Sequence, residues 1–292
     1  MSALFDQSYQ PWTGTFQPHP FRVLAIATAT AKNIFRRHTL ALSLLGGLTM
    51  LMTLPGAFVG LMISGIDPGY IAASALSTSL TWTCLLVLPV AGSGLVASDL
   101  KHNALLMYFS KSIVRADYIV GKLAAAAVLV LLPAVLSPLV SIGVSTYALG
   151  DKATAAYGAQ LSGAVLLSVP IAVIPAIALV MAFSSCTRKT FLAGIGFAVV
   201  YLMLEAIALI LTDAAKLKWG YLLSLNRNVL KISASLMPEM PAGGARMPKM
   251  PGLDLHEMMP FSPWISLAIL AGVSVLSLSV VVWRTADAER RA

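Results

Sequence analysis

The sequence consists of long apolar runs separated by short polar segments. Six runs contain roughly 20 residues or more, the length that an α-helix rising about 1.5 Å per residue needs to cross a hydrocarbon core of about 30 Å. The alternation of apolar and polar residues that marks membrane β-strands is absent. The pattern therefore predicts an all-α polytopic membrane protein with six transmembrane helices, at Leu40–Ile63, Ala73–Val96, Leu123–Leu149, Leu161–Phe183, Phe191–Thr212 and Phe261–Trp283.

Composition supports a lipid environment. Of the 292 residues, 58% are hydrophobic and 11% are charged, and the mean hydropathy is +0.83. Soluble domains carry about 25% charged residues, so this chain has too few polar side chains to cover a surface in water. The two cysteines, Cys84 in a span and Cys186 in a short turn, do not indicate a disulfide framework.

The basic residues orient the bundle, because cytoplasmic loops of membrane proteins are enriched in Lys and Arg. With the N-terminus inside, most of the 20 Lys and Arg residues fall on the cytoplasmic side, and the two short outer loops hold only Lys152. The long outer loop 213–260 is also basic, but long segments cross the membrane largely regardless of charge. Both termini are therefore predicted to be cytoplasmic. The basic residues behind the net charge of +8 are spread along the predicted membrane edges, so this charge does not indicate nucleic-acid binding.

Two segments outside the spans have helical patterns. Before the first span, Phe21, Leu24 and Phe35 recur at helical spacing beside basic residues, which predicts a helix along the membrane surface; a simple basic flank is the alternative. The predicted organisation is a cytoplasmic segment at 1–20, an interfacial helix at 21–38, a transmembrane domain at 39–283 and a cytoplasmic tail at 284–292. In the outer loop, a second amphipathic surface helix is predicted, with an apolar set of Trp219, Leu222, Leu223, Leu230 and Leu236.

A charged segment at 97–122, here called the coupling loop, separates the second and third spans. Its apolar residues Leu100, Ala104, Met107 and Tyr108 share one helical face, and four polar residues precede or interrupt them: Asp99, Lys101, His102 and Asn103. Arg115 and Lys122 then lead into the third span. The pattern predicts a short cytoplasmic helix that could transmit force from a soluble partner, and an ordinary basic loop is the alternative.

The coupling loop resembles a known family. Its acidic residue, basic residues, Leu-Leu pair, Lys-Ser-Ile-x-Arg stretch and Tyr-x-x-Gly-Lys sequence are similar to the corresponding loop of permease subunits in the type-two exporter class of ABC transporters. Members usually carry Glu where this chain has Asp99 and Gly where it has Asn103. The six spans and inside termini fit the same family.

This resemblance implies a function and partners. The permease would export or extract a lipid-like or amphipathic solute across a bacterial inner membrane, paired with a second copy of itself or a related permease. A separate ATPase subunit would bind the coupling loop, and nine residues would contact or position it: Asp99, Leu100, Lys101, His102, Asn103, Ala104, Met107, Arg115 and Lys122.

The chain carries no ATP-binding motif of its own. Its one Gly-Lys pair, Gly121-Lys122, lacks the upstream glycine of a phosphate loop and is followed by Leu123. ATP and Mg are therefore expected on the partner ATPase, and the chain itself is expected to be neither an enzyme nor a cofactor-binding protein. Ser93 lies between two glycines, but all four histidines fall outside the spans, so no histidine base is available to it.

Two features support other functions. Glu205 is the one carboxylate inside a span, where a charge costs about 3 kcal/mol or more, so it must pair, protonate, hydrogen-bond or line a wet cavity. A secondary transporter or channel could use it. The outer loop also contains two Met-x-x-Met pairs, Met237/Met240 and Met247/Met250, which suit Cu(I) or a protein contact. A membrane scaffold that binds a periplasmic partner through this loop is the third hypothesis.

Overall fold

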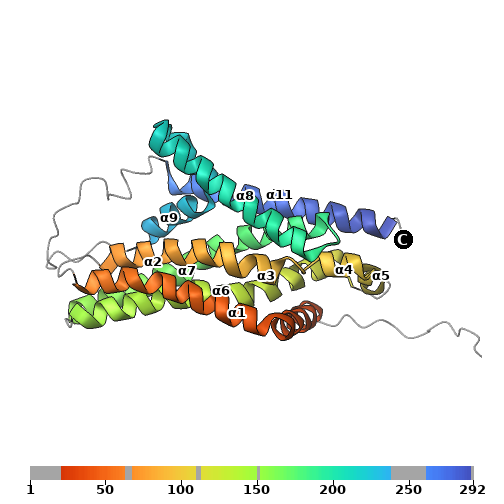
Figure 1. Ribbon diagram of the computed structural model, residues 1–292, viewed down its shortest axis with the longest axis horizontal. Helices are drawn as coiled ribbons and strands as arrows, with labels where there is room; N and C mark the ends of the chain where they lie inside the picture. The colour runs from red at the N-terminus through yellow and green to blue at the C-terminus, as the bar shows by residue number, and fades with distance from the viewer. Residues whose placement is uncertain (1–20, 63–67, 110–112, 150–151, 238–260, 291–292) are drawn as a thin grey trace, which may run out of the picture.

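The computed structural model describes residues 21–62, 68–109, 113–149, 152–237 and 261–290, which are almost entirely helical and contain no strand (Figure 1). Six helices are long and apolar enough to cross a membrane, which confirms the predicted number of spans and the all-α class. In chain order the elements are α1 (Arg22–Met62), α2 (Pro68–Trp82), the π-helix η1 (Thr83–Val87), α3 (Leu88–Gly92), α4 (Ala97–Lys101), α5 (Ala104–Phe109), α6 (Arg115–Leu149), α7 (Lys152–Cys186), α8 (Thr190–Leu209), the π-helix η2 (Ile210–Ala214), the 3-10 helix η3 (Lys218–Leu223), α9 (Leu225–Leu236) and α11 (Pro263–Arg290).

The helices are longer than the apolar runs that predicted them. α6 and α7 contain 35 residues each, which at about 1.5 Å per residue is about 52 Å, well beyond a hydrocarbon core of about 30 Å. The extra turns at the start of α6 include Arg115 and Asp117, which are polar. Helical hydrogen bonding therefore continues past the point at which the sequence stops being apolar.

α1 contains a break at the boundary expected between the N-terminal helix and the first span. His38 has non-helical backbone angles, φ −125° and ψ 22°, within an otherwise helical segment. The turns before it point away from the axis of the later part of α1 (Figure 1). Ile26 and Ala27 of these turns are buried, so the N-terminal helix packs against the bundle.

The second span is segmented at its proline and glycines. Pro89 has no N–H to donate to the carbonyl four residues earlier, and the preceding turn, η1, is a π-helix in which the Leu88 N–H bonds to the Thr83 carbonyl. After Gly92 the chain forms a turn at 93–96 and then α4. A Cβ on Gly92 would lie 2.3 Å from Val180 Cγ1, so glycine permits the close approach of α3 and α7.

A hydrogen bond from a neighbouring helix compensates for a proline in α6. Pro138 cannot donate to the Ala134 carbonyl, and the hydroxyl of Ser79 on α2 donates to that carbonyl at 3.2 Å. This cross-helix bond replaces the lost bond within α6. α7 also contains prolines, Pro170 and Pro175, but it remains one helix, so those two do not interrupt it.

α7 is the most enclosed of the spanning helices, and α1, α8 and α11 are the most exposed. Val165, Val169, Ile177 and Met181 of α7 are completely buried, and α7 contacts α6, α8, α9 and α11. α4 and α5 lie at the same end of the bundle as the start of α1 and the end of α11, whereas α9 lies toward the other end (Figure 1). The coupling loop and both described chain ends therefore share one end of the molecule.

Candidate coupling site

The described part of the coupling loop forms two short helices, and the prediction of one helix is corrected. α4 ends at Lys101 and α5 begins at Ala104. Between them Asn103 has a left-handed backbone with φ 53°. Asn is one of the few residues other than glycine that adopt this conformation readily, so the chain turns here. Leu100 and Tyr108 of the predicted face nevertheless both pack against the core.

The turn between α4 and α5 presents polar side chains to the outside. Lys101, His102 and Asn103 are exposed, whereas Leu100 and Ala104 are half-buried. The His102 ring nitrogen Nδ1 lies 2.8 Å from the Ser98 carbonyl, which holds the imidazole against α4. Three predicted contact residues therefore gather at an exposed tip, with two less polar neighbours beside it.

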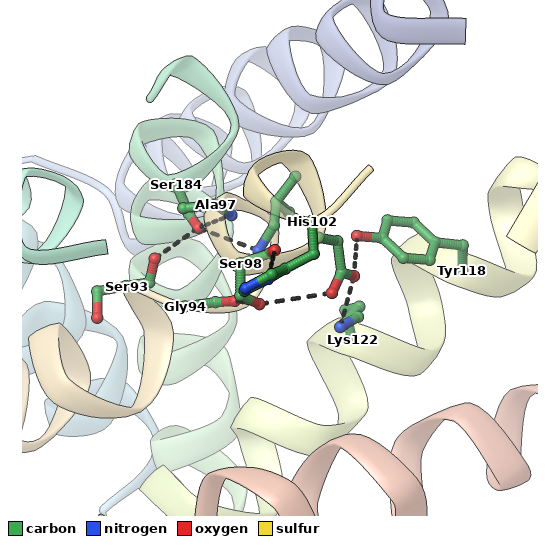
Figure 2. A network of polar contacts seen from close by, with 10 residues as sticks. Ser93, Gly94, Ala97, Ser98, His102, Tyr118, Lys122 and Ser184 are labelled. Carbon is green, nitrogen blue, oxygen red and sulfur yellow. Dashed lines mark hydrogen bonds and ion pairs between the residues drawn. The ribbon is translucent and has the colours of Figure 1, made fainter. Parts of the chain in front are cut away.

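Asp99, Tyr118 and Lys122 form a buried group, here called the anchor cluster. Tyr118 and Lys122 are labelled in Figure 2. The Lys122 ammonium lies 2.8 Å from Asp99 Oδ2, and the Tyr118 hydroxyl donates to the same oxygen at 2.8 Å. The Lys122 and Asp99 side chains are only 6% and 13% exposed. A pair this buried is screened little by solvent, so it fixes α4 against the start of α6.

Aromatic rings enclose the anchor cluster. Tyr108 of α5 packs at 5.4 Å between ring centroids against Tyr118, and the Lys122 ammonium lies 5.5 Å from the Tyr118 centroid. Burial, and then the nearby Asp99 carboxylate, raise the pKa of Tyr108 above its usual value. Its phenol therefore stays neutral at physiological pH and adds no charge beside Asp99.

Gly121 brings a further helix to the cluster. A Cβ at this position would lie 2.8 Å from Ile26 Cγ2 and 3.2 Å from the Val23 carbonyl oxygen of α1. The three specified residues of the Tyr-x-x-Gly-Lys sequence thus have distinct structural tasks. Tyr118 and Lys122 bind Asp99, and Gly121 lets the N-terminal part of α1 pack on α6.

Ser184 of α7 bonds to the chain just before α4 (Figure 2). Its hydroxyl accepts from the N–H groups of Val96 and Ala97 at 3.0 and 2.9 Å and donates to the Ser93 carbonyl at 2.7 Å. The first N–H groups of a helix have no partner within it. Ser184 therefore supplies from another helix the cap that α4 lacks.

The structure separates the predicted site residues by task. Asp99 and Lys122 are buried and position the loop, while Lys101, His102 and Asn103 form its exposed turn. Arg115 is exposed at the start of α6, and the side chain of Met107 lies outside the described residues. Tyr118 and Ser184 were not predicted as site residues. Tyr118 could have been found, because it lies one helical turn before Lys122, but no sequence signal indicated Ser184.

Glu205 lies on α8 and binds the start of α9. Its carboxylate accepts from the Ser224 hydroxyl at 2.6 Å and from the Asn226 N–H at 3.2 Å. Ser224 in turn accepts from the Arg227 N–H at 2.9 Å as the N-cap of α9. A carboxylate beside a helix N-terminus is stabilised by the unpaired N–H groups and the helix dipole. Both contacts are donors to Glu205, so it caps α9.

α9 confirms a helix in the outer loop. Asn228, Val229 and Ile232 are buried, and Trp219 and Leu236 of the predicted apolar set are exposed. Asn228 can be buried because its amide donates to the Leu222 and Ser224 carbonyls at 3.0 and 2.7 Å. Residues 238–260, which hold most of the Met-rich sequence, lie outside the described residues.

Comparison with models of known protein families gives no match, and none of the curated proteins is significantly similar to the chain.

Proposed function

We propose that this chain is the membrane subunit of an ATP-driven transporter of the type-two exporter class of ABC transporters. In this proposal a separate ATPase subunit binds the exposed turn between α4 and α5. The subunit works with a second copy of itself or a related permease and exports or extracts a lipid-like or amphipathic solute. Both termini and the coupling loop are cytoplasmic, the membrane is a bacterial inner membrane, and the first turns of α1 lie along its surface.

One observation carries the proposal: an exposed polar turn is attached to the bundle through buried contacts. Lys101, His102 and Asn103 form the exposed part. Behind it, Asp99 binds Lys122 and Tyr118 of α6, and Ser184 of α7 holds the start of α4. A force applied at the turn would be transmitted through these buried contacts to two long helices, α6 and α7. That arrangement suits a lever between a soluble motor and a membrane bundle.

The backbone at Asn103 also supports the family resemblance. Members of that class usually carry glycine at the corresponding position, and here the residue has φ 53°. Glycine and asparagine are the residues that best tolerate this conformation. The difference between the chain and the family is therefore conservative in backbone terms.

The Glu205 contacts favour a structural task over proton or ion coupling. Both carboxylate oxygens are occupied by donors from the N-terminus of α9. Asn226 also donates to the Ser77 and Thr81 hydroxyls of α2 at 2.9 and 2.8 Å. This polar group connects α9 to α2 and α8. We therefore place the coupling chemistry at the opposite end of the bundle.

The test is co-purification of an ATPase with the native protein. The wild-type chain, carrying an affinity tag, is expected to co-purify from its native membrane with a protein that has a phosphate loop, and the complex is expected to hydrolyse ATP. Replacing Leu100 and Ala104 together by Asp should remove both the partner and the ATP hydrolysis. A turn-directed double change, Lys101→Glu with His102→Glu, should weaken the association because it inverts the charge of the exposed surface.

A matched control tests the other end of the molecule. Lys218→Glu changes an exposed lysine in η3 and should leave the complex intact. The substituted residues are exposed or half-buried, so each variant is expected to retain the fold. Thermal unfolding of each purified protein checks this. Normal ATPase association in a folded Leu100→Asp/Ala104→Asp variant would refute the proposed docking site.

A further inference from the structure

A groove of about 440 Å³ opens between α1, α3 and α8, outside the anchor cluster. A volume of this size is within the range of small-molecule sites in proteins. Gly194 lines the groove, and a Cβ at this position would be 3.1 Å from the Pro89 carbonyl oxygen. This glycine permits the close approach of α8 to α3, and α1 also lines the groove.

The lining changes from polar to apolar along all three elements. On α1, Arg37 and His38 precede Ala41. On α3 and the turn after it, Ser93 and Gly94 follow Pro89 and Val90. On α8, Thr190 precedes Phe191, Gly194, Ile195 and Ala198. In each case the polar residue lies on the side of its element that leads to the end of the bundle with α4 and α5: toward the start of α1, in the turn before α4 and at the start of α8 (Figure 1). The eight residues from Thr190 to Ala198 rise about 12 Å along α8.

The polar end of the groove attracts anions. Arg37 and His38 line it, and no Asp or Glu is among its described lining residues. α8, a helix of 20 residues, begins at Thr190 beside them without a side-chain cap, so the positive end of its dipole lies at the same place. A basic side chain and a helix N-terminus together suit a phosphate group.

The apolar end faces lipid. At this end Leu44 of α1 and Ile195 of α8 are 72% and 43% exposed, and Phe191, which lines the groove next to Thr190, is 75% exposed. Such exposure is expected of side chains in contact with acyl chains. A soluble anion would use only the polar end and leave the apolar walls uncovered. A lipid with an anionic headgroup fits both ends at once.

We propose that this groove binds one anionic phospholipid from the leaflet that borders α4 and α5. Its phosphate lies beside Arg37 and His38, and one acyl chain lies along Val90, Ile195 and Ala198. This lipid site goes beyond the transport function and requires no ATPase, so it can be tested on the purified chain alone.

The test uses photoreactive lipids. The full-length protein is reconstituted into phosphatidylcholine vesicles that contain a small fraction of either phosphatidylglycerol or phosphatidylcholine with a photoreactive acyl chain. After illumination, mass spectrometry of peptides locates the label. We expect phosphatidylglycerol to label α3 and α8 at Val90, Ile195 or Ala198 more strongly than phosphatidylcholine does.

Variants separate the two ends of the groove. Arg37→Ala should reduce labelling by phosphatidylglycerol about fivefold, the effect typical of one basic residue at an anionic membrane surface, and should leave labelling by phosphatidylcholine unchanged. Arg37→Lys should keep most of the preference. Ala198→Phe, which fills the apolar end, should reduce labelling by both lipids. The matched control is Arg36→Ala, because Arg36 is exposed but does not line the groove.

Three results would overturn the proposal. They are equal labelling of the wild-type groove by the two lipids, equal effects of Arg36→Ala and Arg37→Ala, and displacement of the phosphatidylglycerol label by inorganic phosphate. The last result would identify a site for a free anion instead of a lipid.

Discussion

The buried ion pair between Asp99 and Lys122 gives the sharpest prediction about the coupling site. Three variants test it: Asp99→Asn, Lys122→Met and the double variant with both changes. Each single change removes one charge and leaves the other buried. The double change removes both charges and keeps side chains of similar size, so no uncompensated charge remains.

The expected magnitudes follow from burial. The two side chains are 13% and 6% exposed, and their charged atoms are 2.8 Å apart. Removing one member of such a pair costs about 3–5 kcal/mol, whereas replacing both by neutral residues is often nearly neutral. The Tyr118 hydroxyl that also donates to Asp99 softens the loss in Lys122→Met. The double variant should therefore cost less than either single one, with a coupling energy of about 3 kcal/mol.

Unfolding in mixed detergent micelles measures these values. Tryptophan fluorescence can follow the titration with a denaturing detergent, because the chain has 5 Trp. Asp287→Asn serves as control, since Asp287 lies 4.0 Å from Arg284 with both side chains about one-third exposed, and such a pair contributes less than about 1 kcal/mol. Additive effects of the two single changes would refute the assignment of Asp99 and Lys122 as a buried, mutually dependent pair.

Three further predictions concern the turn, the α7 contact and α9. Asn103→Val should destabilise the protein by about 1–2 kcal/mol because of the left-handed backbone, whereas Asn103→Gly should change stability little; equal effects in thermal unfolding would contradict this. Ser184→Ala leaves buried backbone groups without a partner and should cost about 1–3 kcal/mol of stability. The adjacent Ser185→Ala removes only a bond within α7 and should cost less. A larger loss in Ser185→Ala than in Ser184→Ala would exclude the capping role. Glu205→Ala should cost about 1 kcal/mol locally and speed hydrogen exchange of the α9 amides. Met203→Ala, on the exposed side of α8, should leave that exchange unchanged. Unchanged exchange in Glu205→Ala would show that the carboxylate does not hold α9.

The sequence was sufficient for the number of long apolar helices and for placing the coupling loop at the same end of the bundle as both described chain ends (Figure 1). Runs of about 20 apolar residues leave few alternatives to membrane-spanning helices, because backbone groups in lipid must bond within the segment. The amphipathic pattern also ended the predicted N-terminal helix at residue 38, where α1 has its break, and the sequence displays at Pro89 a residue that lacks a backbone N–H. These features depend on local composition and on the covalent structure of proline, both of which the sequence displays directly.

Tertiary contacts determine the features that sequence reasoning missed. The spacing of Leu100, Ala104 and Tyr108 favoured one helix, but the backbone turns at Asn103 between two packed segments. Ser184 is far from α4 in the chain and carries no motif, so its capping bonds could not be predicted. In α9, burial of Asn228 depends on the Leu222 and Ser224 carbonyls that accept from it, and hydrophobic periodicity does not register such bonds.

Photo-crosslinking from the turn between α4 and α5 tests the central claim most directly. A photoreactive amino acid in place of the exposed residue His102 is activated in native membranes, and the crosslinked partner is identified by mass spectrometry. The proposal predicts a crosslink to a cytoplasmic ATPase with a phosphate loop, and no such product from the same group at the control position Lys218. A crosslink from position 102 to a protein on the outer side of the membrane would contradict it.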